Sequence, residues 1–252
     1  MDAPTQAPTA WWERASAWTL LGILGVALAL RLGYYGWAQN HGLAYQVDGV
    51  EAFEVAANYE AGQERAQYIG QPNCNPHSKL PGPLWTLIGV AGLKLGGRWE
   101  TTAILILMAN LAAIALTWRL ARDTVGAAAA NCGGLIMSVS LWMVQYSSII
   151  WNPSPMPLLG ALVFLAAFEC VRRERCWLIF WLPLLLLVGA QVHMSTLSLI
   201  LPLAGFFWLA RVRVNWPWLV GGTLAAVACY LPYLLGDARH DWANTRGIIT
   251  GG

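Results

Sequence analysis

The sequence predicts an all-α polytopic membrane protein with about seven transmembrane helices. Hydrophobic residues make up 57% of the 252 residues against 11% charged, and the mean hydropathy is +0.50. Apolar runs long enough to cross a bilayer also recur along the chain. The net charge of +2 provides neither a basic field for nucleic acid nor an acidic tail. Partners are therefore expected in or beside the membrane.

The first predicted span runs from Trp18 to Trp37, after a polar leader of residues 1–17. Because the span lacks the small-residue cleavage site of a signal peptide, we expect it to be retained. Further apolar runs cover residues 100–118, 125–148, 155–171, 176–192, 194–211 and 216–235. A membrane module of residues 18–236 and a tail of residues 237–252 result.

Basic residues predict the orientation. The densest cluster, Arg172, Arg173 and Arg175, should mark a cytoplasmic turn. Each span moves the chain to the other side of the membrane, so the number of spans between Arg14 and that turn decides the side of Arg14. Arg14 lies in the cytoplasm only if the short, Gly-rich stretch of residues 84–95 does not cross the membrane. We therefore predict a multi-pass protein of the plasma (inner) membrane with its leader in the cytoplasm, its tail outside, and a re-entrant or interfacial segment at residues 84–97.

This topology places a long loop, residues 40–82, on the outer face. The loop holds five of the 13 acidic residues: Asp48, Glu51, Glu54, Glu60 and Glu64. Asp48 would be the N-cap of a helix-like stretch from Val50 to Arg65, with juxtamembrane helices expected in the loop. Two interpretations stay open: Asp48 and Glu51 form a capping box, or the fixed Asp48 carboxylate serves as a general base.

A Pro-punctuated turn follows in the loop and holds His77 and Lys79 near headgroup level. A lysine there can bind phosphate and a histidine can act as a donor or an acid/base, or both can contact anionic lipid headgroups. Arg31 lies within the first span, where a charge either serves a functional site or snorkels to the surface.

Further polar residues lie near the outer ends of later spans. Tyr146 and Asn152 lie at the outer end of the third span, and Gln191 and His193 lie at the outer end of the fifth. A lone histidine at such a place is more often a hydrogen-bonded core residue than a ligand. All these exceptions map to the outer face. Carboxylates with basic and amide groups at headgroup depth suit a reaction on a phosphate-bearing lipid.

The pattern resembles the membrane-embedded GT-C glycosyltransferases, in particular the family 39 type, similar to dolichyl-phosphate-mannose-protein mannosyltransferase and to bacterial lipid A aminoarabinose transferase. It consists of Leu30-Arg31-Leu32, an early Asp then Glu in the first outer loop, a Pro-rich re-entry, Trp151-Asn152-Pro153 opening a span, and Gln191-Val192-His193-Met194-Ser195 closing another. Members usually write the Asp and Glu as neighbours, whereas this chain has Asp48-Gly49-Val50-Glu51, and certain members have an acidic residue where Asn152 stands.

The resemblance implies a GT-C-like core and a polyprenyl-phosphate-linked sugar as donor, with Asp48 activating the acceptor. Lys79 resembles a lysine that precedes the re-entry proline in some members and would face the donor phosphate. Members usually continue into further spans and an acceptor-binding outer domain. The chain is thus expected to be either a minimal core or a fragment that lacks its acceptor domain.

We therefore expect an inverting hexosyl or pentosyl transferase that moves a sugar to a hydroxyl of a lipid, glycan or protein acceptor on the outer face. The expected roles are catalysis by Asp48 and Glu51, phosphate binding by Lys79, His77 and Arg31, and support by Asn152, Gln191, His193 and Tyr146. The alternatives are a lipid-linked glycan transporter or flippase and a non-catalytic membrane subunit. We expect no cofactor and no required metal, because the loop acids lack a ligand-spaced motif and the cysteines are scattered singly.

Overall fold

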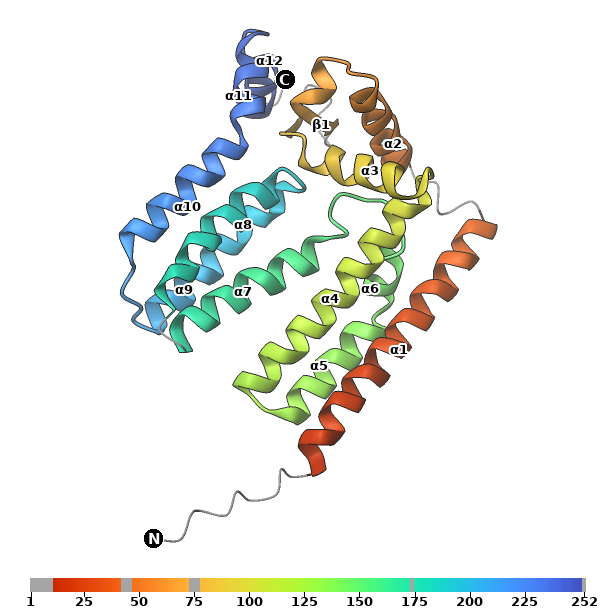
Figure 1. Ribbon diagram of the computed structural model, residues 1–252, viewed down its shortest axis with the longest axis vertical. Helices are drawn as coiled ribbons and strands as arrows, with labels where there is room; N and C mark the ends of the chain where they lie inside the picture. Colours follow the sequence, from red (N-terminus) through yellow and green to blue (C-terminus); the bar gives the residue numbers. More distant parts are fainter. Residues whose placement is uncertain (1–10, 42–46, 73–77, 173–174, 251–252) are drawn as a thin grey trace.

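The computed structural model describes residues 11–41, 47–72, 78–172 and 175–250, which fold into a helical protein (Figure 1). The helices are α1 (Trp11–Asn40), α2 (Val47–Glu60), α3 (Leu84–Gly96), α4 (Glu100–Thr124), α5 (Ala127–Val139), α6 (Leu141–Tyr146), α7 (Met156–Arg172), α8 (Trp181–Ala190), α9 (Ile200–Leu209), α10 (Trp216–Cys229), α11 (Leu231–Ala238) and α12 (Ala243–Thr250). Short 3-10 helices are η1 (Arg65–Gln67), η2 (Cys176–Phe180), which leads into α8, and η3 (Met194–Leu199), which leads into α9. Two strands, β1 (Ile69–Pro72) and β2 (Lys79–Pro81), pair antiparallel.

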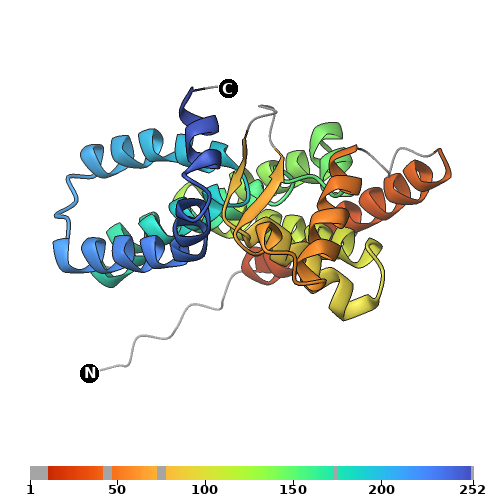
Figure 2. The same cartoon turned by 90° about the horizontal axis from the view of Figure 1, so that it is seen from above.

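The long helices form a bundle, and α2, α3, the two strands, α11 and α12 gather at one end of it. In Figure 1, α1, α4, α5, α7, α8 and α10 run in a similar slanted direction, while α2, α3, β1, α11 and α12 lie at the upper end. Seen from above in Figure 2, the β-hairpin and α12 lie between the half that contains α9 and α10 and the half that contains α1 and α2. We call the end with α2 and α3 the loop end, and the opposite end the basic end.

Small residues let α1, α4 and α5 pack closely. Ile23 and Ala27 of α1, Ile114 and Trp118 of α4, and Ala130 of α5 form one buried cluster. A Cβ on Gly134 of α5 would lie 3.2 Å from the Trp118 ring and 3.3 Å from Ile23. Such small interfacial residues are typical of helices that associate within membranes. A second cluster holds the other half together, with Val163, Ala167, Leu182, Leu186 and Leu203 from α7, α8 and α9.

In the part of the chain that the structure describes, two helices have the length and composition to cross a membrane. They are Ala17–Asn40 within α1 and Glu100–Thr124, which is α4. The pair α10 and α11 would be a third if the two helices, bent by 46°, act as one span. Large apolar side chains face outward, and Leu201, Trp208 and Leu209 are each more than three-quarters exposed. An apolar exterior of this kind indicates membrane association. Seven spans stay a prediction.

The third predicted span is interrupted. The apolar run of residues 125–148 forms two helices, α5 and α6, which meet at Ser140 with φ −58° and ψ 121°. The break leaves carbonyl groups at the end of α5 without partners in the helix. As described below, Arg31 of α1 supplies donors to two of them. Hydropathy alone did not show the break, because the run stays apolar through it.

The expected interfacial segment is a helix that lies across the loop end of the bundle (Figure 1). α3 begins after Pro83 and ends at Gly97, whose φ of 64° is left-handed and favours glycine. Gly92 and Gly96 pack against Thr102 and Thr101 of α4, so α3 is held close to that helix. A helix that lies across the end of the bundle in this way has the orientation that an interfacial segment requires. The depth of α3 in the membrane stays a prediction.

The outer loop contains one feature that the sequence analysis missed, the β-hairpin. Ile69 pairs with Pro81 and Pro72 with Lys79, with an irregular register between the two pairs. The strands have four and three residues, which is too short for an alternating pattern to be visible. A Cβ on Gly70 would lie 3.0 Å from the Leu80 Cβ and 3.1 Å from the Gly82 carbonyl oxygen. The strands thus approach closely because residue 70 is glycine.

Candidate functional site

Segments that the sequence analysis expects to form a site meet in one buried cluster at the loop end. The buried members are Ala52, Leu80, Trp85, Ala103, Ile106, Ile150 and Val192. Four of them adjoin predicted site residues: Ala52 follows Glu51, Leu80 follows Lys79, Ile150 lies two residues before Asn152, and Val192 separates Gln191 from His193. The fold therefore brings four distant segments to one place, and the roles of their polar side chains stay predictions.

The position of Asp48 differs from the predicted one. Helix α2 begins at Val47, so Asp48 is in its first turn and is not the residue that precedes the helix. The helix ends at Glu60 and η1 follows at Arg65, whereas a single helix to Arg65 was expected. The side chain of Asp48 and all of His77 lie outside the described residues. Glu51 is half-buried, one turn further along α2.

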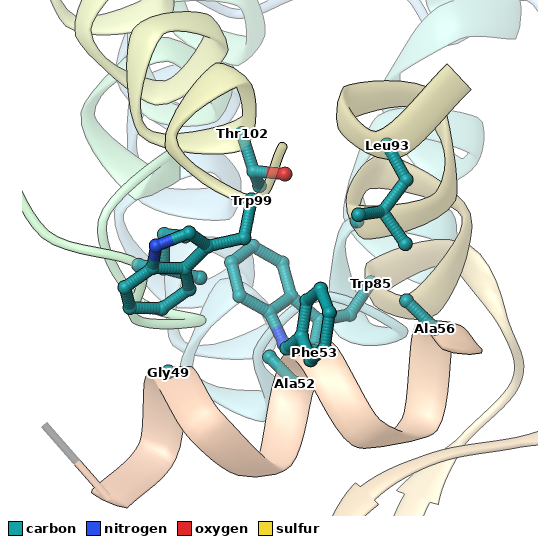
Figure 3. A pocket seen from close by; sticks show the side chains of 10 residues that line it. Gly49, Ala52, Phe53, Ala56, Trp85, Leu93, Trp99 and Thr102 are labelled. Atoms are coloured by element: carbon teal, nitrogen blue, oxygen red, sulfur yellow. The ribbon is translucent and has the colours of Figure 1, made fainter. Parts of the chain in front are cut away.

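The backbone beside Asp48 is tightly packed. A Cβ on Gly49 would lie 3.1 Å from the Trp99 ring and 3.3 Å from the Ile150 carbonyl oxygen. Glycine at residue 49 therefore lets the start of α2 rest against the segment before α7. Figure 3 shows this seam, with Ala52 and Phe53 of α2 facing Trp85 and Trp99. The cavity left there is about 10 Å³, which is too small for a substrate and marks a packing interface.

A larger, polar cavity lies between the β-hairpin and the α11–α12 segment. Its volume is about 220 Å³, and its lining residues are Arg65, Tyr68, Ile69, Ser78, Lys79, Asp237, His240, Ala243 and Asn244. Lys79 was predicted, whereas Arg65, Asp237, His240 and Asn244 were not. The last three come from residues that the sequence analysis treated as a tail. His240 lies three residues after Asp237, and Asn244 lies four residues after His240. In a helical tail this spacing would place the three residues on one face, and that was the signal available in the sequence.

The Asp237 carboxylate organises the tail side of this cavity. It is 1% exposed, and its Oδ1 accepts a hydrogen bond from the Asn244 backbone N–H at 3.0 Å. Its Oδ2 accepts from the Thr245 N–H at 2.9 Å and from the Thr245 hydroxyl at 2.7 Å. The Tyr233 hydroxyl lies at 3.4 Å. A buried carboxylate is tolerated when it is hydrogen-bonded in this way, and here it fixes the start of α12 on α11.

Asn244 joins the tail to the β-hairpin at Lys79. Its Oδ1 accepts a hydrogen bond from the Lys79 N–H at 2.7 Å, and its Nδ2 donates to the Lys79 carbonyl at 3.1 Å. The side-chain amide therefore pairs with β2 as a neighbouring strand would. Two bonds to one residue fix the backbone of Lys79 against α12.

Tyr68 and His240 face each other across the same cavity. The Tyr68 hydroxyl lies 3.0 Å from His240 Nδ1, and the two rings are stacked with their centroids 5.7 Å apart. His240 Nδ1 also lies 2.9 Å from the Gly236 carbonyl oxygen, which can only accept. Burial raises the pKa of Tyr68 despite the opposing charge of Arg65, so its hydroxyl stays protonated and available for hydrogen bonding.

Gln191 connects three parts of the fold. Its Nε2 donates to the Cys229 carbonyl at the end of α10, at 3.1 Å. Its Oε1 lies close to Gly82, where a Cβ would be only 2.5 Å away. Gly82 has a φ of 114°, so the turn before α3 requires glycine for both its backbone conformation and this contact. The structure thus gives Gln191 a packing role at the loop end.

His193 lies between α8 and η3, outside both apolar segments. Its Nδ1 accepts a hydrogen bond from the Ser195 backbone N–H at 3.2 Å and lies 2.6 Å from the Ser195 hydroxyl. This makes His193 the N-cap of η3. Burial lowers the pKa of His193, which favours the neutral imidazole. Its Nδ1 is therefore engaged in local structure.

Arg31 is fully buried and does not snorkel. Its guanidinium donates hydrogen bonds to the carbonyls of Ala27 at 3.1 Å, Ser138 at 3.1 Å and Met137 at 3.2 Å. Two of these carbonyls end α5, where a cation and donors are both favourable. The cavity that Lys79 lines does not include Arg31. The structure gives Arg31 a role in joining α1 to α5, and its binding of the donor phosphate stays a prediction.

Tyr146 is the centre of an aromatic group, and Asn152 follows the last ring of that group, Trp151, in the sequence. The Tyr146 ring packs between Trp142 at 4.3 Å and Trp151 at 4.6 Å, measured between ring centroids. Asn152 is half-buried in the turn before α7. That turn is held by Asn110 of α4, a buried residue the sequence analysis missed, whose Nδ2 donates to the Ser154 carbonyl at 3.0 Å. A single amide inside an apolar helix was the available signal.

Among the described residues, no three His, Cys, Asp or Glu side chains come together as a metal site. Searches of known protein families, of curated proteins and of solved structures each find nothing that matches the chain.

Proposed function

We propose that the protein is a membrane glycosyltransferase that moves a sugar from a polyprenyl-phosphate donor to a hydroxyl group at the loop end. The observation that carries the proposal is the convergence of α2, β2, the turn before α7 and the α8–η3 junction on one buried cluster. A site on a lipid-linked substrate has to lie at one end of a membrane bundle, where polar groups and an apolar surface meet. We assign this end to the outer face of the plasma membrane.

In the proposed reaction Asp48 is the general base. A carboxylate in the first turn of a helix is stabilised in its charged form by the helix dipole, and α2 supplies that turn. As the acceptor hydroxyl oxygen bonds to the anomeric carbon, its proton passes to Asp48 and the bond from that carbon to the phosphate oxygen breaks. The polyprenyl phosphate leaves, and the single displacement inverts the anomeric carbon. Glu51 lies one turn along the same helix.

Lys79 is proposed to stabilise the departing phosphate. It lines the 220 Å³ cavity together with Arg65 and His240, so cationic or donating groups come from three separate elements. Asp237 is the one acidic residue of this lining, and its oxygens are engaged by Asn244 and Thr245. Basic groups fixed where negative charge develops are the usual means of stabilising such a leaving group.

Labelled polyprenyl-phosphate sugars in sealed vesicles test the proposal against the alternatives. A transferase consumes the donor and releases free polyprenyl phosphate when hydroxyl acceptors are supplied. A transporter would move the labelled donor between leaflets and leave it intact, and a non-catalytic subunit would do neither. Lys79→Met should abolish most of the release, while Lys94→Met, at an exposed lysine of α3 paired with Glu60, serves as the matched control.

A further inference from the structure

An amphipathic groove opens at the basic end of the bundle, away from the proposed site. It lies between α4, α7 and the η2–α8 segment and has a volume of about 320 Å³. Its lining residues are Arg119, Leu162, Leu165, Ala166, Glu169, Arg175, Trp177, Leu178, Trp181 and Leu185. The volume falls in the range of small-molecule sites, and most of the wall is apolar.

Both walls of the groove change from apolar to charged toward the basic end of the bundle. On α7 the lining residues Leu162, Leu165 and Glu169 follow one helical face from apolar to charged. The opposite wall runs the other way along the chain, from Leu185 at its apolar end to Arg175 at its charged end. The charged ends coincide because α7 ends at Arg172 and η2 begins at Cys176. A ligand that fits has an apolar chain and a polar head.

The charge at the polar end is positive. Arg119 lies 3.8 Å from Glu169 and 4.0 Å from Asp123, and Arg172 lies 3.2 Å from Asp123. Among the residues that the structure describes at this end, the acidic Glu169 and Asp123 are thus already paired with arginines. Arg175 adds a further guanidinium on the exposed rim of the groove. Guanidinium groups present several donors in a plane, which suits the oxygens of a phosphate.

Two tryptophans indicate the depth at which the ligand lies. Trp177 and Trp181 are 46% and 42% exposed on the groove wall, next to the arginines. Tryptophan is enriched at the level of lipid headgroups, where its ring is partly apolar and its N–H is wet. The basic end of the groove therefore belongs at headgroup level, with Leu162 and Leu185 deeper in the bilayer.

We propose that this groove binds one anionic phospholipid of the surrounding membrane. Its phosphate is held by Arg175 and Arg119, and an acyl chain lies along the leucines of α7 and α8. The surplus positive charge favours an anionic headgroup over a zwitterionic one. The inference does not depend on the proposed transferase activity, because the charged end of the groove lies where α7 ends. Figure 1 shows that end of α7 on the side of the bundle away from α2 and α3.

Native mass spectrometry of the full chain tests this. The protein would be purified from bilayer nanodiscs that contain equal amounts of phosphatidylglycerol and phosphatidylcholine, and the lipids that stay bound would be counted. We expect wild type to retain phosphatidylglycerol in preference. Arg175→Gln should lower this retention about tenfold, the effect of losing one charge-assisted hydrogen bond. Leu165→Trp should fill the groove and lower retention without changing any charge.

Arg213→Gln is the matched control, because Arg213 is an exposed arginine in the turn between α9 and α10. It should leave lipid retention unchanged. Each variant would first be shown to keep the helical circular dichroism of wild type. Equal retention of the two lipids by wild type would overturn the proposal. So would equal losses in Arg175→Gln and Arg213→Gln, or full retention in Leu165→Trp.

Discussion

The Asp237 carboxylate links α11, the start of α12 and, through Asn244, the strand that carries Lys79. Asp237→Asn replaces one of its two acceptor oxygens by an NH₂ group, which then faces an N–H or O–H donor. We expect the free energy of unfolding to fall by about 1–3 kcal/mol, the cost of leaving buried polar groups unpaired. The measurement is unfolding in mild detergent followed by circular dichroism.

Asp241→Asn is the control for that change. Asp241 is exposed, and its φ of 55° is a conformation that asparagine accepts readily. Its effect should stay within about 0.5 kcal/mol, as for surface substitutions in general. If both variants lose the same stability, the buried network is not what holds the tail.

His193 predicts a pH dependence. An unfolded histidine binds its proton near pH 6.5, and burial lowers the pKa of His193 in the fold. Below about pH 6.5 the unfolded chain therefore binds more protons than the folded one, so stability falls as the pH falls, until the folded pKa is passed. His193→Asn keeps an N-cap acceptor and should flatten this part of the profile. His41→Asn, at an exposed histidine, is the control variant.

From the sequence, a single residue could be recognised as unusual where a charge stood in an apolar run. The residues that it contacts in the fold could not be predicted. Arg31 was correctly singled out as unusual in a span, but two of the three carbonyls that it binds belong to α5, about a hundred residues later. Such a partner cannot be inferred from one sequence. Asp237, His240 and Asn244 were missed because their importance comes from docking on a hairpin that was itself not predicted.

At the scale of elements, α3 gives the sharpest prediction. If α3 lies at the outer surface, Leu95→Cys, at a side chain 72% exposed near the end of α3, should react with a membrane-impermeant maleimide added to the outside of intact cells. Val125→Cys, 76% exposed between α4 and α5, should react only after permeabilisation. Both changes would be made in a chain whose native cysteines are replaced by alanine. Labelling of residue 95 only after permeabilisation would contradict the assignment of the loop end to the outer face.

Element types were largely predictable because long apolar runs favour helices in membranes, where backbone groups must be satisfied internally. Breaks and short strands were not predictable, because they depend on tertiary partners. Helix α5 ends just before Ser140, where Arg31 donates a hydrogen bond to a carbonyl of the last turn of α5. The strand β2 exists because Leu80 is buried and Asn244 pairs with the backbone of Lys79.

At the scale of the whole molecule, the two ends of the bundle differ in character. The loop end gathers α2, α3, the hairpin and the tail (Figure 1), and a polar cavity lies between the hairpin and the tail. At the opposite end, arginines line an amphipathic groove. The separation of acidic loop and basic turns was visible in the sequence. The contacts between distant segments were not visible in the sequence, because a cluster that joins Ala52 to Val192 forms only in the folded protein.

We propose that the loop end transfers a sugar with Asp48 as the base. The most direct test is the release of free polyprenyl phosphate from a labelled polyprenyl-phosphate sugar by the purified protein in nanodiscs, with a panel of sugars and acceptors. Wild type and Asp241→Asn should release it, and Asp48→Asn should be slower by about 10²- to 10⁴-fold, the usual contribution of a general base. Undiminished release by Asp48→Asn, with unchanged circular dichroism, would contradict the account, as would intact donors with wild type across the whole panel.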